Sequence, residues 1–230
     1  MPPHRQRTSH LTADGAERQS STVDARGQAW RASTRVAAAT AKRGRSWVGG
    51  LLLALGSSPR QESAFHQGEL GELAVAASLE RRLAHGPAIL LHDRRMPRGR
   101  GNIDHLAIAP SGVFVIDAKN IHGKVRVVQP LFGNQKLMVA GRDRSRLIDG
   151  LDRQVAAVRA ALAADHPETP VQGVLCFTTA DLPLVGTSRM RGHLLLYRRG
   201  LTKRLNASGP LGEGAIAAIA HVLADAFPPA

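Results

Sequence analysis

The chain has 230 residues, enough for one well-buried α/β domain with extensions, and a formal net charge of +13. This charge suits a polyanionic partner, either nucleic acid or an anionic membrane face, without choosing between them. The single cysteine, Cys176, excludes an intramolecular disulfide and a cysteine-based zinc site. We therefore expect a reducing, cytoplasmic setting.

Residues 1–60 differ in composition from the rest of the chain. They carry ten Lys or Arg residues against three acids, and few large apolar side chains precede Trp47. Such a segment buries too little surface to offset the entropy of ordering, so we predict a mostly disordered basic tail, with a short helix near Trp47–Leu55. That apolar run falls short of the ~20 residues that a membrane span needs. The tail either adds affinity for phosphates or is a solvated leader.

An orderly pattern of helices and strands begins at Ser63. Stripes of helical period predict helices over 63–83, 146–164 and 213–226. Short apolar or alternating runs predict strands over 88–91, 103–109, 113–118, 171–177 and 194–197, and a hairpin from 124–128 to 136–139 that turns near Gly133. The core order is therefore helix, three strands, helix, strand, which predicts an α/β fold.

The candidate chemistry lies on the hairpin around Pro110-Ser111. A turn centred there pairs positions whose numbers sum to 221, so Asp104 faces Asp117, and Lys119 shares that face. Two carboxylates this close repel each other unless a proton or a cation intervenes. A hard cation such as Mg²⁺ prefers oxygen ligands and keeps waters for a substrate. The alternative is a plain salt bridge between Lys119 and one aspartate at a strand end.

Further candidates surround this hairpin, each with a structural alternative. Glu72 begins the inward stripe of the first helix, although an acid there also stabilises the helix dipole. Gln154 interrupts an apolar stripe and is either a satisfied buried amide or a group that reaches a phosphate or a water. His122 and Lys124 follow the strand and are candidate phosphate contacts. His105 points to the opposite face from Asp104, so we interpret it as structural.

Several of these segments together resemble the nuclease-related domain (NERD) family of the PD-(D/E)XK superfamily. The segments are Gly68-Glu69-Leu70-Gly71-Glu72, Asn102-Ile103-Asp104-His105 and Gly112-Val113-Phe114-Val115-Ile116-Asp117-Ala118-Lys119-Asn120, followed by Gly123. The resemblance is strong from Phe65 to Val125 and weak beyond Gln154. It implies a restriction-endonuclease-like core over 64–180 within a domain 61–230, with a mixed central sheet flanked by helices.

The resemblance also implies an activity and a role for each residue. Asp104 and Asp117, with the main-chain carbonyl of Ala118, would hold Mg²⁺ or Mn²⁺, and Lys119 would orient the attacking water. Glu72 corresponds to the acid of the helix and belongs to the expected catalytic set, where it would bind metal through water or complete a second metal site. Gln154 matches a glutamine on the following helix, and Ile103 replaces the proline of the superfamily name. The expected reaction is hydrolysis of phosphodiester bonds in DNA.

Two rival functions stay open at this stage. One is a non-catalytic nucleic-acid-binding module that keeps the nuclease fold. The other is an envelope-associated protein anchored by Trp47–Leu55. Beyond the basic tail, several arginines are candidates for contacts to the nucleic-acid backbone: Arg94, Arg95, Arg98, Arg100, Arg142, Arg144 and Arg146.

Overall fold

The computed structural model describes residues 59–84, 86–97, 101–182 and 188–230. The predicted tail, apart from its last two residues, and the predicted helix over Trp47–Leu55 lie outside these ranges. The first described element is helix α2 (Pro59–Arg82), which begins earlier than the sequence pattern predicted. No helix within the described part of the chain is long and apolar enough to span a membrane.

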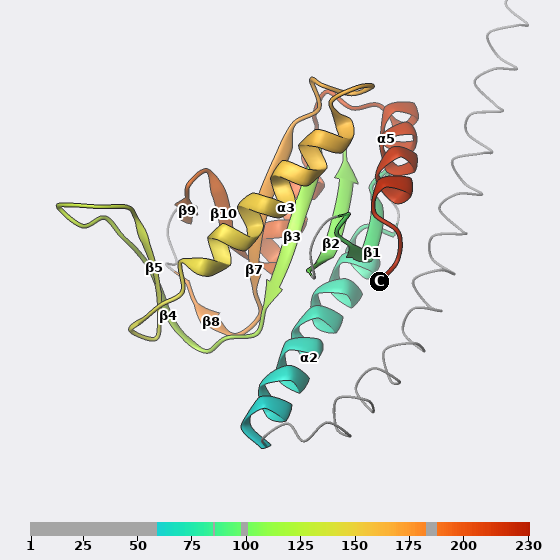
Figure 1. Cartoon of the computed structure of the whole chain (residues 1–230). Coiled ribbons are helices and arrows are strands. Elements are labelled where there is room, and N and C mark those ends of the chain that lie inside the picture. Colours follow the sequence, from blue (N-terminus) through green and yellow to red (C-terminus); the bar gives the residue numbers. More distant parts are fainter. Residues whose placement is uncertain (1–58, 85, 98–100, 183–187) are drawn as a thin grey trace, which may run out of the picture.

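A six-stranded mixed sheet forms the centre of the molecule (Figure 1). Its strands, in spatial order, are β1 (Ile89–Arg95), β2 (Asn102–Ala109), β3 (Gly112–Lys119), β7 (Val171–Phe177), β10 (His193–Tyr197) and β9 (Ser188–Met190). The first three strands pair antiparallel, whereas β7 runs parallel to both of its neighbours, β3 and β10. The predicted mixed sheet is therefore confirmed. The central position of β7 explains its almost uninterrupted apolar sequence.

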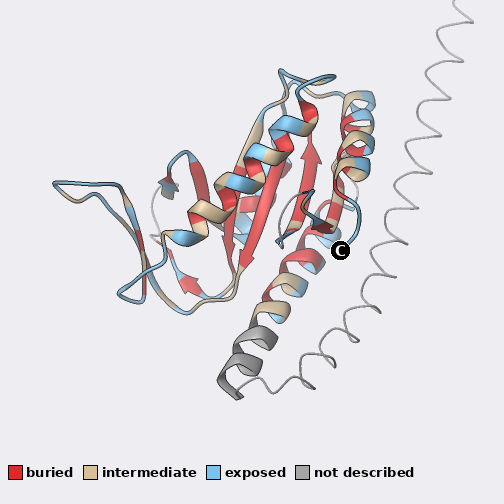
Figure 2. Ribbon diagram, in the orientation of Figure 1, coloured by how far each residue is buried: buried red, intermediate tan, exposed pale blue. Residues whose placement is uncertain are grey.

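Helices cover both faces of this sheet. Helices α3 (Arg146–Leu162) and α5 (Glu213–Ala226) pack on one face, and α2 and α4 (Arg198–Leu205) pack on the other. Figure 2 shows buried residues along the sheet, with the helices buried on their inner sides and exposed on their outer sides. The restriction-endonuclease-like α/β architecture expected from the sequence is consistent with this arrangement.

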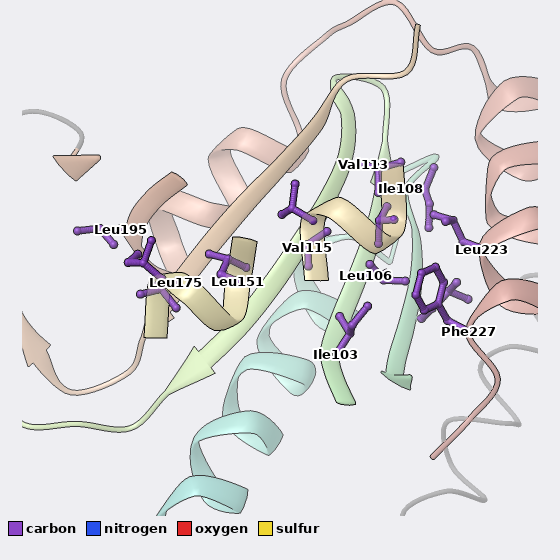
Figure 3. Packing of buried hydrophobic residues seen from close by; sticks show 14 of the residues in the cluster. Ile103, Leu106, Ile108, Val113, Val115, Leu151, Leu175, Leu195, Leu223 and Phe227 are labelled. Atoms are coloured by element: carbon purple, nitrogen blue, oxygen red, sulfur yellow. The ribbon is translucent and has the colours of Figure 1, made fainter. Parts of the chain in front are cut away.

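The larger part of the core lies under α3 and α5. Figure 3 shows Leu151 of α3 beside Leu175 of β7, Val113 of β3 beside Ile108 of β2, and Leu106 of β2 near Phe227. The stripe predicted for α5, with Ile216, Ile219, Ala220 and Leu223 inward, is buried as expected. These contacts fix the orientation of the β2–β3 hairpin, because its apolar face is held by both helices.

A smaller sheet leaves the main one beyond the end of β3. It has the order β6 (Arg142–Asp143), β5 (Lys136–Val139), β4 (Gly123–Val128) and β8 (Ala180–Asp181). Strands β4 and β5 form the predicted antiparallel hairpin, in which Val128 pairs with Lys136. The sequence pattern did not predict α4, β6, β8 or β9.

Candidate functional site

The β2–β3 hairpin brings Asp104 and Asp117 together as the sequence predicted. Its pairs run from Ala109 with Gly112 to His105 with Ile116, which is the register in which paired numbers sum to 221. The antiparallel pattern would next join the main chains of Ile103 and Ala118. Instead, the N–H of Ala118 donates to Oδ2 of Asp104 at 2.8 Å. The Asp104 carboxylate thus replaces a main-chain carbonyl as the acceptor for β3 at the point where β2 and β3 separate.

Lys119 lies against the same group of oxygens. Its Nζ donates to Oδ1 of Asp117 in a short ion pair, and to the carbonyl oxygen of Ala118 at 3.2 Å. Asp117 is buried, whereas the lysine is partly exposed. The ammonium group therefore occupies a place where a carboxylate and a main-chain carbonyl converge on one cation.

The electrostatics of the cluster reflect two crowded carboxylates. Burial and the neighbouring charge of Asp117 raise the pKa of Asp104 well above its usual range, and the charge of Glu72 adds to the rise. Burial lowers the pKa of Lys119, but the charges of Asp117 and Asp104 outweigh it and raise the pKa overall. The lysine is therefore held in its charged form. The acids favour any additional cation that reaches them.

Glu72 approaches this cluster from the other side of the sheet. Helix α2 packs on the face opposite α3, and from Gly68 on, where its burial is described, Gly71 is the first buried residue. A side chain at Gly71 would clash, because its Cβ would lie 2.7 Å from Cβ of Asn120, just past the end of β3. This close approach brings Glu72 near enough to act on the pKa values of both Asp104 and Lys119. The charge of Glu72 therefore acts on Asp104 and Lys119, and its role as a site residue stays a prediction.

Gln154 satisfies only half of its hydrogen-bonding capacity. Its Nε2 donates to the main-chain oxygen of Asn102 at 3.0 Å, next to the strand that carries Asp104. Its Oε1 is buried and has no hydrogen-bond partner among the described residues. The interpretation as a fully satisfied buried amide is therefore not met, and the free oxygen stays available for a donor from a bound water or ligand.

The remaining candidates divide between structural and exposed positions. His105 is buried, and its Nδ1 lies 2.8 Å from Nδ1 of His92, which confirms a place away from Asp104. His122 and Lys124 are exposed where the chain leaves β3, and their contact with phosphate stays a prediction.

The predicted backbone-binding arginines also divide. Arg94 is buried, and its Nη1 reaches the carbonyl oxygen of Phe227 at 3.5 Å. Burial also lowers its pKa. The expectation that Arg94 contacts a phosphate is therefore wrong, because β1 packs against the C-terminal segment. Arg95, Arg142, Arg144 and Arg146 are exposed, whereas Arg98 and Arg100 lie outside the described residues.

Sequence reasoning missed the residues that fix the segment after Lys119. The hydroxyls of Thr178 and Thr179 both donate to Oδ1 of Asn120 at 2.9 Å, and the N–H of Thr178 donates to the carbonyl of Lys119 at 3.1 Å. The signal was the pair of threonines directly after the buried strand β7. These threonines could be placed beside Asn120 only once the parallel pairing of β3 with β7 was known.

The oxygen donors fit a hard divalent cation. Asp104, Asp117 and the carbonyl of Ala118 provide oxygen only, which suits Mg²⁺ or Mn²⁺ and excludes a soft metal. Among the described residues, no three His, Cys, Asp or Glu side chains form a ready metal-binding group. Two carboxylates and one carbonyl nevertheless suit Mg²⁺, which usually binds few protein ligands and retains several waters.

Comparison with known proteins identifies one family. A model of the nuclease-related domain matches residues 67–178. The matched range includes Glu72, Asp104, Asp117, Lys119 and Gln154. No curated protein and no solved structure matches the chain.

Proposed function

We propose that the protein is a divalent-metal-dependent nuclease that hydrolyses phosphodiester bonds in DNA, since residues 67–178 match a model of the nuclease-related domain. The observation that carries the proposal is the convergence of Asp104, Asp117 and Lys119 where β2 and β3 separate. A simple salt bridge needs one acid, whereas this cluster holds two, with a third nearby. DNA and the cytoplasmic setting are part of the proposal, and the strongly basic composition supports the former.

Asp104, Asp117 and the main-chain carbonyl of Ala118 would hold the ion, with Glu72 contributing directly or through a water. When bound, Mg²⁺ or Mn²⁺ would polarise the phosphate and lower the pKa of a water. Asp117 and the Ala118 carbonyl accept hydrogen bonds from Lys119, so an ion held by these two oxygens would take the place of the ammonium group. The ammonium group of Lys119 then orients the attacking water and offsets the negative charge that develops on the phosphate.

Gln154 would position a second polar group at the same site. Its Nε2 is fixed by Asn102, so the unpartnered Oε1 is held in place and can accept a hydrogen bond from a water. His122 and Lys124 lie beyond the end of β3 and would contact neighbouring phosphates.

The test is cleavage of supercoiled, linear and single-stranded DNA, and of RNA, with Mg²⁺, Mn²⁺ or EDTA. Wild type should cut DNA only with a metal, and Asp117→Asn and Lys119→Met should each lose about 100-fold or more. Asp165→Asn and Lys203→Met change the same residue types at exposed positions outside the site and should cut normally. Circular dichroism should show all four variants folded.

Failure of wild type to cut any substrate with either metal would contradict the nuclease proposal. If the same protein binds DNA, the non-catalytic binding module becomes the better account. Cleavage of RNA alone would correct the substrate.

A further inference from the structure

The β4–β5 hairpin leaves the sheet beside the proposed nuclease site. Strand β3 ends at Lys119 and β4 begins at Gly123, so the hairpin starts where the acidic cluster lies. Figure 1 shows it extending away from the helix-covered sheet. Its base is tightly closed, because a Cβ on Gly123 would lie 2.6 Å from Cβ of Ala140 and the glycine has φ +105°. The direction of the hairpin is therefore fixed at its root.

One face of the hairpin anchors it to the core. Val125, Leu137 and Val139 are buried and belong to the main apolar cluster. The alternating positions of β4, Lys124 and Arg126, point to solvent. The hairpin is thus a supported arm with a basic outer face.

The tip of this arm is apolar and exposed. Leu131 is 96% exposed and Phe132 is 92% exposed. The other phenylalanines with described burial, Phe114, Phe177 and Phe227, are all buried. Single exposed apolar residues are ordinary on protein surfaces, but an adjacent Leu-Phe pair at the end of a projecting hairpin leaves a contiguous surface without cover.

The loop that presents this pair has its own local structure. The amide of Gln129 donates to the carbonyls of Pro130 and Gly133, both at 3.4 Å. Gly133 has φ +95°, a conformation that a residue with a side chain rarely adopts. The bond from Gln129 to Gly133 therefore spans the segment that contains the exposed Leu131 and Phe132.

The charge around the arm favours a polyanion. Residues 121–146 contain six Lys or Arg (Lys124, Arg126, Lys136, Arg142, Arg144 and Arg146) against one acid, Asp143, a net charge of +5 from 6 minus 1. Asp143 accepts hydrogen bonds from both the hydroxyl and the N–H of Ser145, and its Oδ2 lies 3.9 Å from Nζ of the exposed Lys136. Cations along a strand pair, with an apolar wedge at its end, match proteins that lay a β-ribbon along DNA and insert side chains between base pairs.

We propose that the β4–β5 hairpin is a duplex-DNA-binding arm: Lys124, Arg126 and Lys136 contact phosphates, while Leu131 and Phe132 insert between base pairs. The inference rests on the proposed nuclease function for its substrate. Beyond that function, it describes how the duplex is held, and its bases locally unstacked, beside the acidic cluster.

The test uses the full chain in EDTA, so that binding is measured without cleavage. Wild type should raise the fluorescence of 2-aminopurine placed within a DNA duplex, because insertion unstacks the base. The double variant Leu131→Ala/Phe132→Ala should lose that rise and bind about tenfold more weakly by fluorescence anisotropy. Phe132→Trp retains an aromatic wedge and should keep the rise.

Charge contacts are tested by salt dependence. Arg126→Gln should lower the slope of log affinity against log salt by about one. Arg199→Gln removes an exposed arginine from α4, away from the arm, and should leave the slope unchanged.

Unchanged affinity and unchanged 2-aminopurine fluorescence in the double variant would overturn the arm, while DNA cleavage by wild type would leave the nuclease proposal standing. Loss of DNA binding in the double variant, with no cleavage by wild type under any metal, would support the arm and contradict the nuclease. Binding to anionic phospholipid vesicles that depends on Leu131 and Phe132, with DNA affinity unaffected, would overturn the arm in favour of a membrane contact.

Discussion

At the scale of single residues, Asp104 affects the stability of the fold in two opposite ways. Its Oδ2 accepts the N–H of Ala118, which holds the end of the hairpin. Its charge, however, is half-buried beside Asp117, and both the partial burial and the neighbouring charge raise its pKa. A raised pKa means that ionisation costs folding free energy once the pH exceeds the ordinary value of the group.

Asp104→Asn should therefore stabilise the metal-free protein and abolish its activity. The amide oxygen can still accept the Ala118 N–H, while the buried negative charge disappears. We expect the melting temperature in EDTA at pH 7 to rise by about 2–5 °C, and the gain to vanish below about pH 4, where Asp104 is protonated in the unfolded chain as well as in the folded protein. A lower melting temperature at pH 7 would show that the charge of Asp104 stabilises the fold.

The pKa of a second aspartate, Asp152, is shifted in the opposite direction. Its Oδ1 lies 2.6 Å from Nε2 of the buried His193, and its Oδ2 accepts from Nη1 of Arg191 at 3.0 Å. Burial acts to raise the pKa of Asp152, but the hydrogen bonds and charges of His193 and Arg191 outweigh it and lower the pKa. The ionised form therefore stabilises the folded state at neutral pH.

Asp152→Asn should destabilise the protein at neutral pH by about 1 kcal/mol, a small amount because the carboxylate is partly exposed. The difference from wild type should be fully present above about pH 5 and shrink as the pH falls through the lowered pKa of Asp152. Urea unfolding at pH 7 and at pH 3.5 measures both values. An equal difference at the two pH values would assign the effect to packing.

At the scale of elements, the approach of α2 to β3 decides where Glu72 lies. Gly71→Ala places a methyl group against Asn120 and should push the helix outward. We expect DNA cleavage to fall by about tenfold or more, since small displacements of a catalytic group are costly. Gly68→Ala is the matched control on the same helix, because its Cβ meets nothing within 4 Å.

Gly68→Ala should retain activity and gain about 0.5–1 kcal/mol of stability from better helix propensity. Comparing the cleavage rates and melting temperatures of the two variants separates the effect of the Gly71–Asn120 contact from the effect of helix propensity. Equal rates would show that the position of Glu72 is not critical.

Local patterns predicted the hairpin well because its register depends on the turn at Pro110-Ser111 and on two alternating strands. Helix α4 was missed because half of its eight residues are basic, and only Leu201, Thr202 and Leu205 are buried. The two-residue strands β6 and β8 have no pattern of their own and exist through pairing with β5 and β4. The place of Gly71 against Asn120 depends on long-range packing, which no local pattern contains.

At the scale of the whole molecule, charge is divided between the described fold and the segment that precedes it. Residues 1–58 carry nine Lys or Arg and three acids, which is +6 of the total +13. Deleting them leaves +7, and the proposed site lies wholly in the remainder. The two parts should therefore make separable contributions to DNA binding and to cleavage.

The chain without residues 1–58 should bind DNA roughly tenfold more weakly at 0.1 M salt, with a shallower salt slope, yet keep its metal-dependent cleavage. Anisotropy at several salt concentrations, together with cleavage at saturating protein, measures the two effects. Loss of cleavage at saturation would show that the deleted segment takes part in the reaction. Vesicle binding lost with this segment would favour the envelope-associated alternative.

The fold extends beyond the family match, which ends at residue 178. Phe227 is buried in the core, and the main chains of Arg95 and Pro228 are hydrogen-bonded at 2.9 Å. The C-terminal segment therefore belongs to the same cooperative structure as the matched residues.

The ion pair of Lys119 with Asp117 has a consequence for how the protein matures. Because the lysine supplies a positive charge to the crowded acids, the chain can complete folding before it acquires an ion. On the proposed function, loading would exchange the ammonium charge for that of the ion, and chelation would reverse the exchange without unfolding the protein. Newly made molecules would then be folded but inert until free divalent ions reach them.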